Sequence, residues 1–290
     1  MFTFEIISQQ VLNGLLTGAS YILIALGLTL IFGIYRMINM AHGAVYMWGA
    51  YFCHVLADSI GMNTYLAMAI AMVLAGLLSV GIERTVFRPL KGCPDWVALV
   101  AGLGLYYALE NFGWIVLGPR ELHIHALATQ EVVRFWGLYA NLQKVILAGV
   151  CLATLVGTML VLKKTDMGRA MRAASADPEA ARLVGINTER MSMLVFFLGG
   201  AFAAAAGSLV GSLTSVAPGM GFRPMIIAFV IVVFGGMGSI MGTVVAGLMV
   251  GVLQNILAYA VTPKFAYCFT MLSLLTIFII RPTGIFGEDK

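Results

Sequence analysis

Residues 11–34 read VLNGLLTGASYILIALGLTLIFGI, and none of these 24 side chains is charged. An α-helix needs about 20 predominantly apolar residues to cross a bilayer, so this stretch is long enough to span one. It exceeds the apolar core of a cleaved signal peptide, and the preceding residues 1–10 contain Glu5 but no basic side chain. We therefore expect a retained transmembrane helix here.

The composition extends this conclusion to the whole chain. Of the 290 residues, 61% are hydrophobic and 10% are charged, whereas a soluble domain has about 25% charged residues. Disordered chains are poor in apolar residues and rich in charge, so that class is excluded too. The net charge of +4 implies no nucleic-acid partner, because membrane proteins collect Lys and Arg in cytoplasmic loops. The four cysteines have no metal-ligand spacing, so we expect no metal site.

Further apolar stretches follow along the chain, at residues 43–57, 62–82, 96–117, 142–162, 191–213, 224–260 and 265–280. We predict an all-α fold, a polytopic transmembrane helical bundle of about eight spans that forms a single domain over residues 1–290. Residues 43–57 are short for a full span. Residues 224–260 are too long for one span and contain the glycine cluster Gly235-Gly236-Met237-Gly238. We therefore expect broken or re-entrant helices within the bundle.

Basic side chains indicate the orientation of the spans, because cytoplasmic loops carry an excess of Lys and Arg. The loop 163–190 contains six of them: Lys163, Lys164, Arg169, Arg172, Arg182 and Arg190. The loop 83–95 contains three more, and two spans separate the two loops, so both assignments agree. This orientation places loop 118–141 outside. If residues 43–57 cross the membrane, it also places the N-terminus outside, with Arg36 and His42 inside.

The loop 163–190 carries helix signals despite its polarity. Ala and Arg favour a helix from about Gly168 to Ala174. A second, short helix is also indicated. Asp177 suits its N-cap, Pro178 its first position and Glu179 its first turn. Gly185 suits the left-handed residue that follows its last turn.

This loop is either a solvated connector or a docking site for a cytoplasmic partner. A connector needs neither this length nor a capped helix, so we favour a docking helix that fits a groove on the partner. The candidate coupling residues are Arg172, Asp177, Pro178, Glu179, Ala181, Leu183 and Gly185.

Two segments are expected to break the helices at membrane depth, one in each half of the chain. They are residues 38–48, and residues 218–224 followed by 235–242. Irregular backbone inside a bilayer must be buried in protein or line a cavity, and transporters use such breaks to bind substrates near the midplane. The candidate substrate-pathway residues are Asn39, His42, Gly43, Glu110, Gly235, Gly236, Gly238 and Ser239.

Two of these candidates have a second interpretation. His42 is either a polar lining or gating residue or, as a lone histidine near Arg36 at a helix start, an interfacial group. Glu110 is either a pathway residue, since ionisable residues within spans are usually functional, or a solvated carboxylate near the outer end of its span, beside Asn111.

Small residues recur at four-residue spacing in three of the apolar stretches. The pairs are Gly14 with Gly18, Gly207 with Gly211, and Gly247 with Gly251. This spacing puts both glycines on one helix face, where they allow two backbones to approach closely. We expect a tightly packed bundle.

Several functional classes lack their sequence motifs. No span has the series of Asp, Glu or His that a proton relay requires, which disfavours an ion-coupled secondary transporter. The sequence has no P-loop, and it has neither a His-Glu-x-x-His nor a Gly-x-Ser-x-Gly motif. We therefore expect a protein that is not an enzyme and that binds no ATP through its own residues.

Taken together, these segments resemble the permeases of branched-chain amino acid ABC transporters. The similarity is carried, in order, by residues 13–27, 37–47, 167–173, 183–187, 235–242 and 281–287. It implies a heterodimer with a second, related membrane subunit, two cytoplasmic ATPase subunits that bind ATP, and a periplasmic substrate-binding protein. It also implies import across a bacterial inner membrane through a cytoplasmic coupling helix. Substrates of the family include leucine, isoleucine and valine, other amino acids, urea and short amides.

The sequence departs from the family pattern at three places. Ala44 stands where Glu often follows His-Gly, Met241 stands where Pro is common, and Glu110-Asn111 replaces Gln-Asn. An added negative charge would repel a carboxylate or attract an amine. These changes therefore bear on which substrate is carried.

Overall fold

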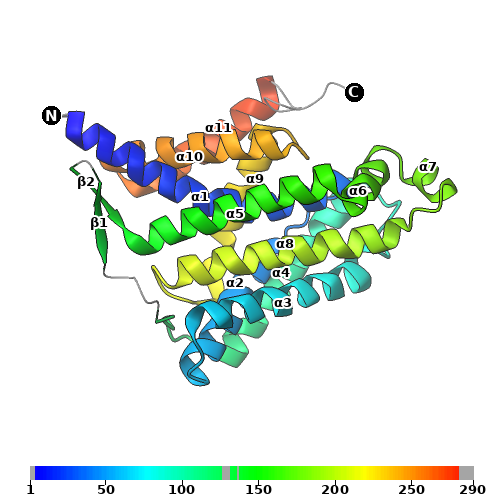
Figure 1. Cartoon of the computed structure of the whole chain (residues 1–290), viewed down its shortest axis with the longest axis horizontal. Helices are drawn as coiled ribbons and strands as arrows, with labels where there is room; N and C mark the ends of the chain where they lie inside the picture. Colours follow the sequence, from blue (N-terminus) through cyan, green and yellow to red (C-terminus); the bar gives the residue numbers. More distant parts are fainter. Residues whose placement is uncertain (1–3, 126–130, 136, 281–290) are drawn as a thin grey trace.

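The computed structural model describes residues 4–125, 131–135 and 137–280, which form a helical bundle with one short β-hairpin (Figure 1). Residues 281–287, which contribute to the family resemblance, lie outside the described residues. The elements, in chain order, are α1 (Phe4–Tyr35), α2 (His42–His54), the π-helical turn η1 (Val55–Ser59), α3 (Thr64–Ile82), the π-helical turn η2 (Glu83–Phe87), α4 (Asp95–Leu117), β1 (Val132–Phe135), β2 (Leu138–Asn141), α5 (Leu142–Lys164), α6 (Asp166–Ala176), α7 (Pro178–Leu183), α8 (Thr188–Gly211), the 3-10 turn η3 (Pro218–Gly221), α9 (Phe222–Gly235), α10 (Ile240–Ala260) and α11 (Pro263–Ile280).

Seven of the described helices are long and apolar enough to cross a membrane: α1, α3 with η2, α4, α5, α8, α9 with η3, and α10. The stretch 224–260 is divided between α9 and α10. α10 has the length for its own crossing, and α9 has it together with η3. The glycine cluster is therefore a turn between two spans. By contrast, α2 has only 13 residues, which agrees with the prediction that 43–57 is short for a full span.

The centre of the bundle is formed by α1 and α8. In each of them 72% of the most apolar segment is buried, compared with 17% in α4 and α5. The short helix α2 packs on α8 and α3, and all of its residues from 42 to 50 are buried. The outer faces of α4 and α5 are thus left for lipid or another subunit.

Two of the three glycine pairs predicted to allow close packing face each other across α1 and α10. A Cβ atom added at Gly18 would lie 2.8 Å from the carbonyl oxygen of Gly247, and one at Gly251 would lie 2.5 Å from Gly14 O and from Gly18 Cα. Because these glycines have no side chains, the two backbones are in contact. The resulting van der Waals packing replaces the hydrophobic driving force, which is missing between helices in lipid.

The two ends of the bundle differ (Figure 1). One end carries the hairpin of β1 and β2, which was not predicted and whose strands pair from Val132 opposite Asn141. This end also holds the start of α1, because Gln9 exchanges hydrogen bonds of 2.7 and 2.9 Å with the backbone of Tyr139. The other end carries α6 and α7. Loop 118–141 and loop 163–190 therefore lie at opposite ends, as the basic residues predicted.

A buried carboxylate joins α3 to α8 at the α6–α7 end. Glu83 is fully buried in η2, and its carboxylate lies 3.4 Å from the guanidinium of Arg88 and accepts a hydrogen bond from Ser192 at 3.2 Å. The same guanidinium lies 3.1 Å from the exposed carboxylate of Glu189. This network puts loops 83–95 and 163–190 on one side of the bundle, in agreement with the prediction.

Replacing Glu83 with alanine should lower the free energy of unfolding by about 2 kcal/mol. Removing one partner of a buried ion pair costs about 3–5 kcal/mol, and the partial exposure of Arg88 reduces that cost. The matched control is Glu189→Ala, which removes the exposed carboxylate from the same guanidinium and should change stability by less than about 0.5 kcal/mol. Thermal unfolding of the purified chain in detergent would compare them, and equal losses would contradict the structural role of Glu83.

Candidate functional site

The loop between α5 and α8 forms the capped helix that its sequence predicts. The Asp177 side chain accepts hydrogen bonds from the backbone N–H groups of Glu179 at 2.9 Å and Ala180 at 3.0 Å, and Pro178 is the first residue of α7. Gly185 has a φ of +83°, the left-handed conformation expected of a helix terminator. The first predicted helix, 168–174, is present within the longer α6.

The tip of this loop exposes apolar side chains. Leu183 is 89% exposed and Val184 is 76% exposed, although both are residues that folded proteins usually bury. Ala181 points the other way and is buried. The remaining coupling candidates are exposed polar or turn residues: Arg172, Asp177, Pro178, Glu179 and Gly185. The structure thus presents an apolar tip on a polar loop, at the end of the bundle opposite the β-hairpin (Figure 1).

Arg36 ties this loop to the membrane helices. Its guanidinium donates hydrogen bonds to the carbonyl oxygens of Ser175 at 2.9 Å and Ala176 at 3.4 Å, which end α6. A cation is favourable there because the last carbonyls of a helix carry partial negative charge. The Ser175 hydroxyl donates in turn to the carbonyl of Gly33 in α1. Arg36 itself has a φ of +53°, a strained conformation for a residue other than glycine.

A second cation, Lys91, contacts the same end of α1. The ammonium of Lys91 lies 4.5 Å from the centre of the Tyr35 ring, within range of a cation–π interaction. Burial lowers the pKa of Lys91 from its ordinary value, and the nearby Glu83 opposes this shift. The last residues of α1 are thus held by contacts from the loops 83–95 and 163–190.

The chain between Arg36 and α2 turns back into the bundle, so that α2 begins among buried residues. His42 is fully buried, and its Nε2 lies 3.2 Å from the carbonyl oxygen of Ile24 in the middle of α1. The interfacial interpretation of His42 is therefore wrong, because no part of the side chain reaches solvent. Asn39 is also buried, with 1% exposure, and its amide oxygen and nitrogen have no hydrogen-bond partner among the described residues.

The two breaks predicted in separate halves of the chain meet here. A Cβ atom at Gly43 would lie 2.8 Å from the carbonyl oxygen of Gly221, and one at Gly221 would lie 2.0 Å from Gly43 O. The start of α2 therefore crosses η3 in direct backbone contact. Such a close crossing of irregular segments satisfies the requirement that they be buried within protein at membrane depth.

Glu110 borders the same crossing from α4. Its carboxylate oxygen lies 3.4 Å from the position of a Cβ atom at Gly219, and its side chain is half-buried. One helical turn earlier, Tyr106 packs against Phe222 at the start of α9, with 5.6 Å between ring centroids. Four candidates from sequence, Asn39, His42, Gly43 and Glu110, are thus placed on elements around the start of α2.

The glycine candidates are located elsewhere. Gly236 and Gly238 have φ angles of +96° and +90° in the turn between α9 and α10, and the Ser239 hydroxyl caps α10 by accepting from the N–H of Gly242 at 3.1 Å. A Cβ atom at Gly238 would lie 3.3 Å from Cα of Gly33, at the end of α1 that Ser175 contacts. Gly235, Gly236, Gly238 and Ser239 therefore lie toward the α6–α7 end of the bundle and not at the α2 crossing.

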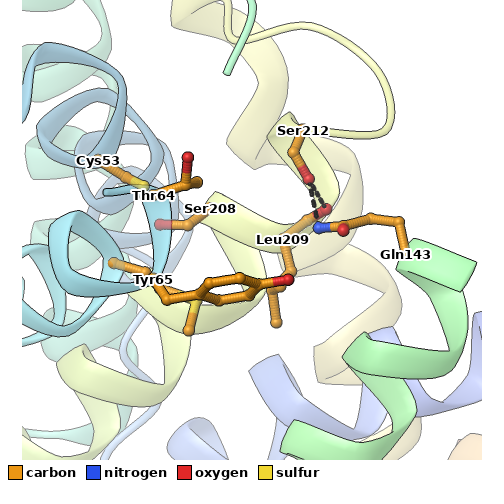
Figure 2. Close-up of a pocket in the computed structure, with 8 residues that line it drawn as sticks. Cys53, Thr64, Tyr65, Gln143, Ser208, Leu209 and Ser212 are labelled. Atoms are coloured by element: carbon orange, nitrogen blue, oxygen red, sulfur yellow. Dashed lines mark hydrogen bonds between the residues drawn. The ribbon is translucent and has the colours of Figure 1, made fainter. Parts of the chain in front are cut away.

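A small cavity between α2, α3, α5 and α8 is not a substrate site. Figure 2 shows Gln143 reaching across it to Ser212, with a hydrogen bond of 2.8 Å, while Cys53, Tyr65 and Ser208 line the remaining walls. Its volume of about 10 Å³ is about that needed for one water molecule. An amino acid does not fit there.

Three residues that link distant segments at the α6–α7 end were not singled out from the sequence. Arg36 and Arg88 were counted as orientation signals and Glu83 was not considered, because ion pairs between distant segments leave no local pattern. Arg36 is also unusual in its positive φ, a conformation that sequence indicates only where glycine or asparagine stands.

Known proteins are similar to this chain in sequence or in fold. Residues 10–280 match the family model of the branched-chain amino acid transport system / permease component. The high-affinity branched-chain amino acid transport system permease protein LivH of Escherichia coli (strain K12) is 34% identical over 296 residues, which cover 97% of this chain and 96% of LivH. The corresponding protein BraD of Pseudomonas aeruginosa is 32% identical over 295 residues, with the same coverage of each chain. PsaBC from Streptococcus pneumoniae, solved in complex with Fab, has a similar fold, with a TM-score of 0.51 at 15% identity over 94% of this chain and 92% of that chain.

Proposed function

Because this chain belongs to the family of branched-chain amino acid transport permeases, we propose that it imports a branched-chain or related amino acid into a bacterial cell. It is a multi-pass membrane protein and a permease of the ABC type. We further propose that it lies in the inner membrane, pairs with a second, related permease and receives substrate from a periplasmic binding protein. Two cytoplasmic subunits would bind the ATP, so that this chain needs no cofactor of its own.

The exposed tip of α7 is the observation that supports coupling to an ATPase most directly. An amphipathic helix can lay its apolar residues in a groove of a partner, and Leu183 and Val184 are the most exposed large apolar side chains at this end. Arg36 joins α6 to the segment that leads into α2. Movement of the docked loop would thereby reach the start of α2.

The start of α2 is the best-supported part of the substrate pathway. Nearly all buried polar groups in proteins are hydrogen-bonded, and the unpaired amide of Asn39 next to a helix start is an exception. Helix starts of this kind, broken within the membrane, bind substrates in other transporters because their free N–H groups carry partial positive charge. We propose that Asn39 and His42 turn toward the substrate when the crossing of α2 and η3 opens.

Transport by the complete system tests the proposal. The chain would be co-reconstituted in proteoliposomes with its second permease, both ATPases and the binding protein, and uptake of leucine, isoleucine, valine and urea would be measured. We expect uptake of at least one amino acid that requires ATP and is lost without the ATPases. Uptake of urea alone would support the alternative substrate class. Uptake by this chain alone, driven by an ion gradient, would contradict the ABC mechanism.

A further inference from the structure

A second cavity, of about 170 Å³, lies between α1, α9, α10 and α11. It has space for a small molecule, since an apolar cavity of about 150 Å³ in another protein binds benzene. Its lining is mostly polar and includes Thr17, Tyr21, Arg223, Asn255 and Tyr267. None of these residues was among the sequence candidates, and the lining does not include Asn39, His42 or Gly43.

The walls of this cavity are held by hydrogen bonds between three helices. The Tyr21 hydroxyl donates to Gln254 Oε1 at 2.8 Å, and Gln254 Nε2 donates to the Thr270 hydroxyl at 2.8 Å. These bonds join α1, α10 and α11 and occupy both ends of the Gln254 amide. Arg223 differs, because its guanidinium forms no ion pair with any carboxylate of the described residues. Arg223 is an exposed residue, and its guanidinium carbon lies 4.8 Å from the centre of the Tyr267 ring, within range of a cation–π interaction.

The charge of the cavity selects an anion. A guanidinium presents a fork of N–H donors that matches a carboxylate. Arg223 is in the first turn of α9, where the positive end of the helix dipole adds to its charge. Among the residues that the structure describes, no Asp or Glu lines the cavity. The oxygen atoms of Thr17 and Asn255 are the acceptors available to an ammonium group.

We propose that this cavity is a binding site for the transported amino acid, in which Arg223 pairs with the substrate carboxylate. The proposal rests on the proposed function. Urea and neutral amides have no carboxylate to pair with Arg223. Arg223 would therefore favour amino acids over these substrates. It also places this contact beside the crossing of η3 and α2, because Arg223 follows Gly221 by two residues.

The test compares an amino acid with its carboxamide, which differs at the carboxylate alone. Uptake of each would be measured in the complete proteoliposome system, and the preference for the amino acid would be compared between wild type and Arg223→Gln. The binding protein contributes the same preference to both, so its effect cancels in this comparison. We expect the preference to fall by about 10-fold or more, the effect of removing one hydrogen bond to a charged group.

Two controls make this result specific. Arg223→Lys keeps the charge and should retain most of the preference. Lys264→Gln removes an exposed charge in the first turn of α11, outside the cavity lining, and should leave the preference unchanged. An unchanged preference in Arg223→Gln would overturn the proposal. A fall in preference seen only in liposomes that contain anionic phospholipid would overturn it too, because a lipid phosphate would then be the ligand. Absence of amino acid uptake by the wild type would instead contradict the proposed function.

Discussion

Replacing both Leu183 and Val184 with aspartate is expected to abolish ATP-driven uptake while leaving the chain folded in the membrane. Both side chains are at least three-quarters exposed, so their loss removes no packing within the chain. In a groove on an ATPase subunit, each would be buried as an apolar anchor. Such hot-spot residues cost about 2 kcal/mol or more when removed, which is about a 30-fold loss of affinity, and a buried, unpaired carboxylate adds to that cost.

Co-purification of the ATPase subunits and substrate uptake would be measured together. The matched control is Met167→Asp, which places the same charge at an exposed apolar residue of α6 in the same loop and should retain both activities. Gly185→Val provides an independent variant: its φ of +83° costs a side-chain-bearing residue about 1–2 kcal/mol, although no atom lies within 4 Å to clash. Normal uptake in the double aspartate variant would contradict docking through α7.

The local features of this loop could be predicted because they depend on residues close in sequence. Asp177, Pro178 and Gly185 each satisfy a requirement of a helix end, whatever the rest of the chain does. The lengths of the apolar stretches likewise predicted most spans, and the excess of basic side chains predicted which loops share an end. Each of these signals follows from the bilayer thickness or from backbone geometry.

The contacts between distant segments could not be predicted in the same way. The burial of His42 depends on where α1 places the carbonyl of Ile24, whereas its position near Arg36 at a helix start allowed an interfacial interpretation. The glycine cluster at 235–238 predicted a break in a helix, and the structure forms there a turn with positive φ angles at Gly236 and Gly238, close to Gly33. A glycine pattern shows that a backbone bends or is approached closely, but not which segment approaches it.

For the glycine pairs of α1 and α10, a substitution can test which segment approaches them. Replacing Gly251 with leucine is expected to prevent stable folding, because even its Cβ atom would lie 2.5 Å from Gly14 O and from the backbone of Gly18. These are backbone atoms, so no side chain can rotate away, and the two helices would have to separate. Overpacked cores typically lose about 1–3 kcal/mol, and a forced separation of two spans should exceed that range.

The control for this substitution is Gly149→Leu in α5, where no atom lies within 4 Å of the added Cβ and the position is exposed. There, leucine should be neutral or slightly stabilising, since glycine costs a helix interior about 1 kcal/mol. The two variants would be compared by the yield of monodisperse protein and the midpoint of thermal unfolding in detergent. A normal midpoint for Gly251→Leu would mean that α1 and α10 do not cross at these glycines. An equal fall in yield and midpoint in both variants would show that an added leucine is harmful at either position. Only a fall confined to Gly251→Leu supports direct backbone contact between α1 and α10.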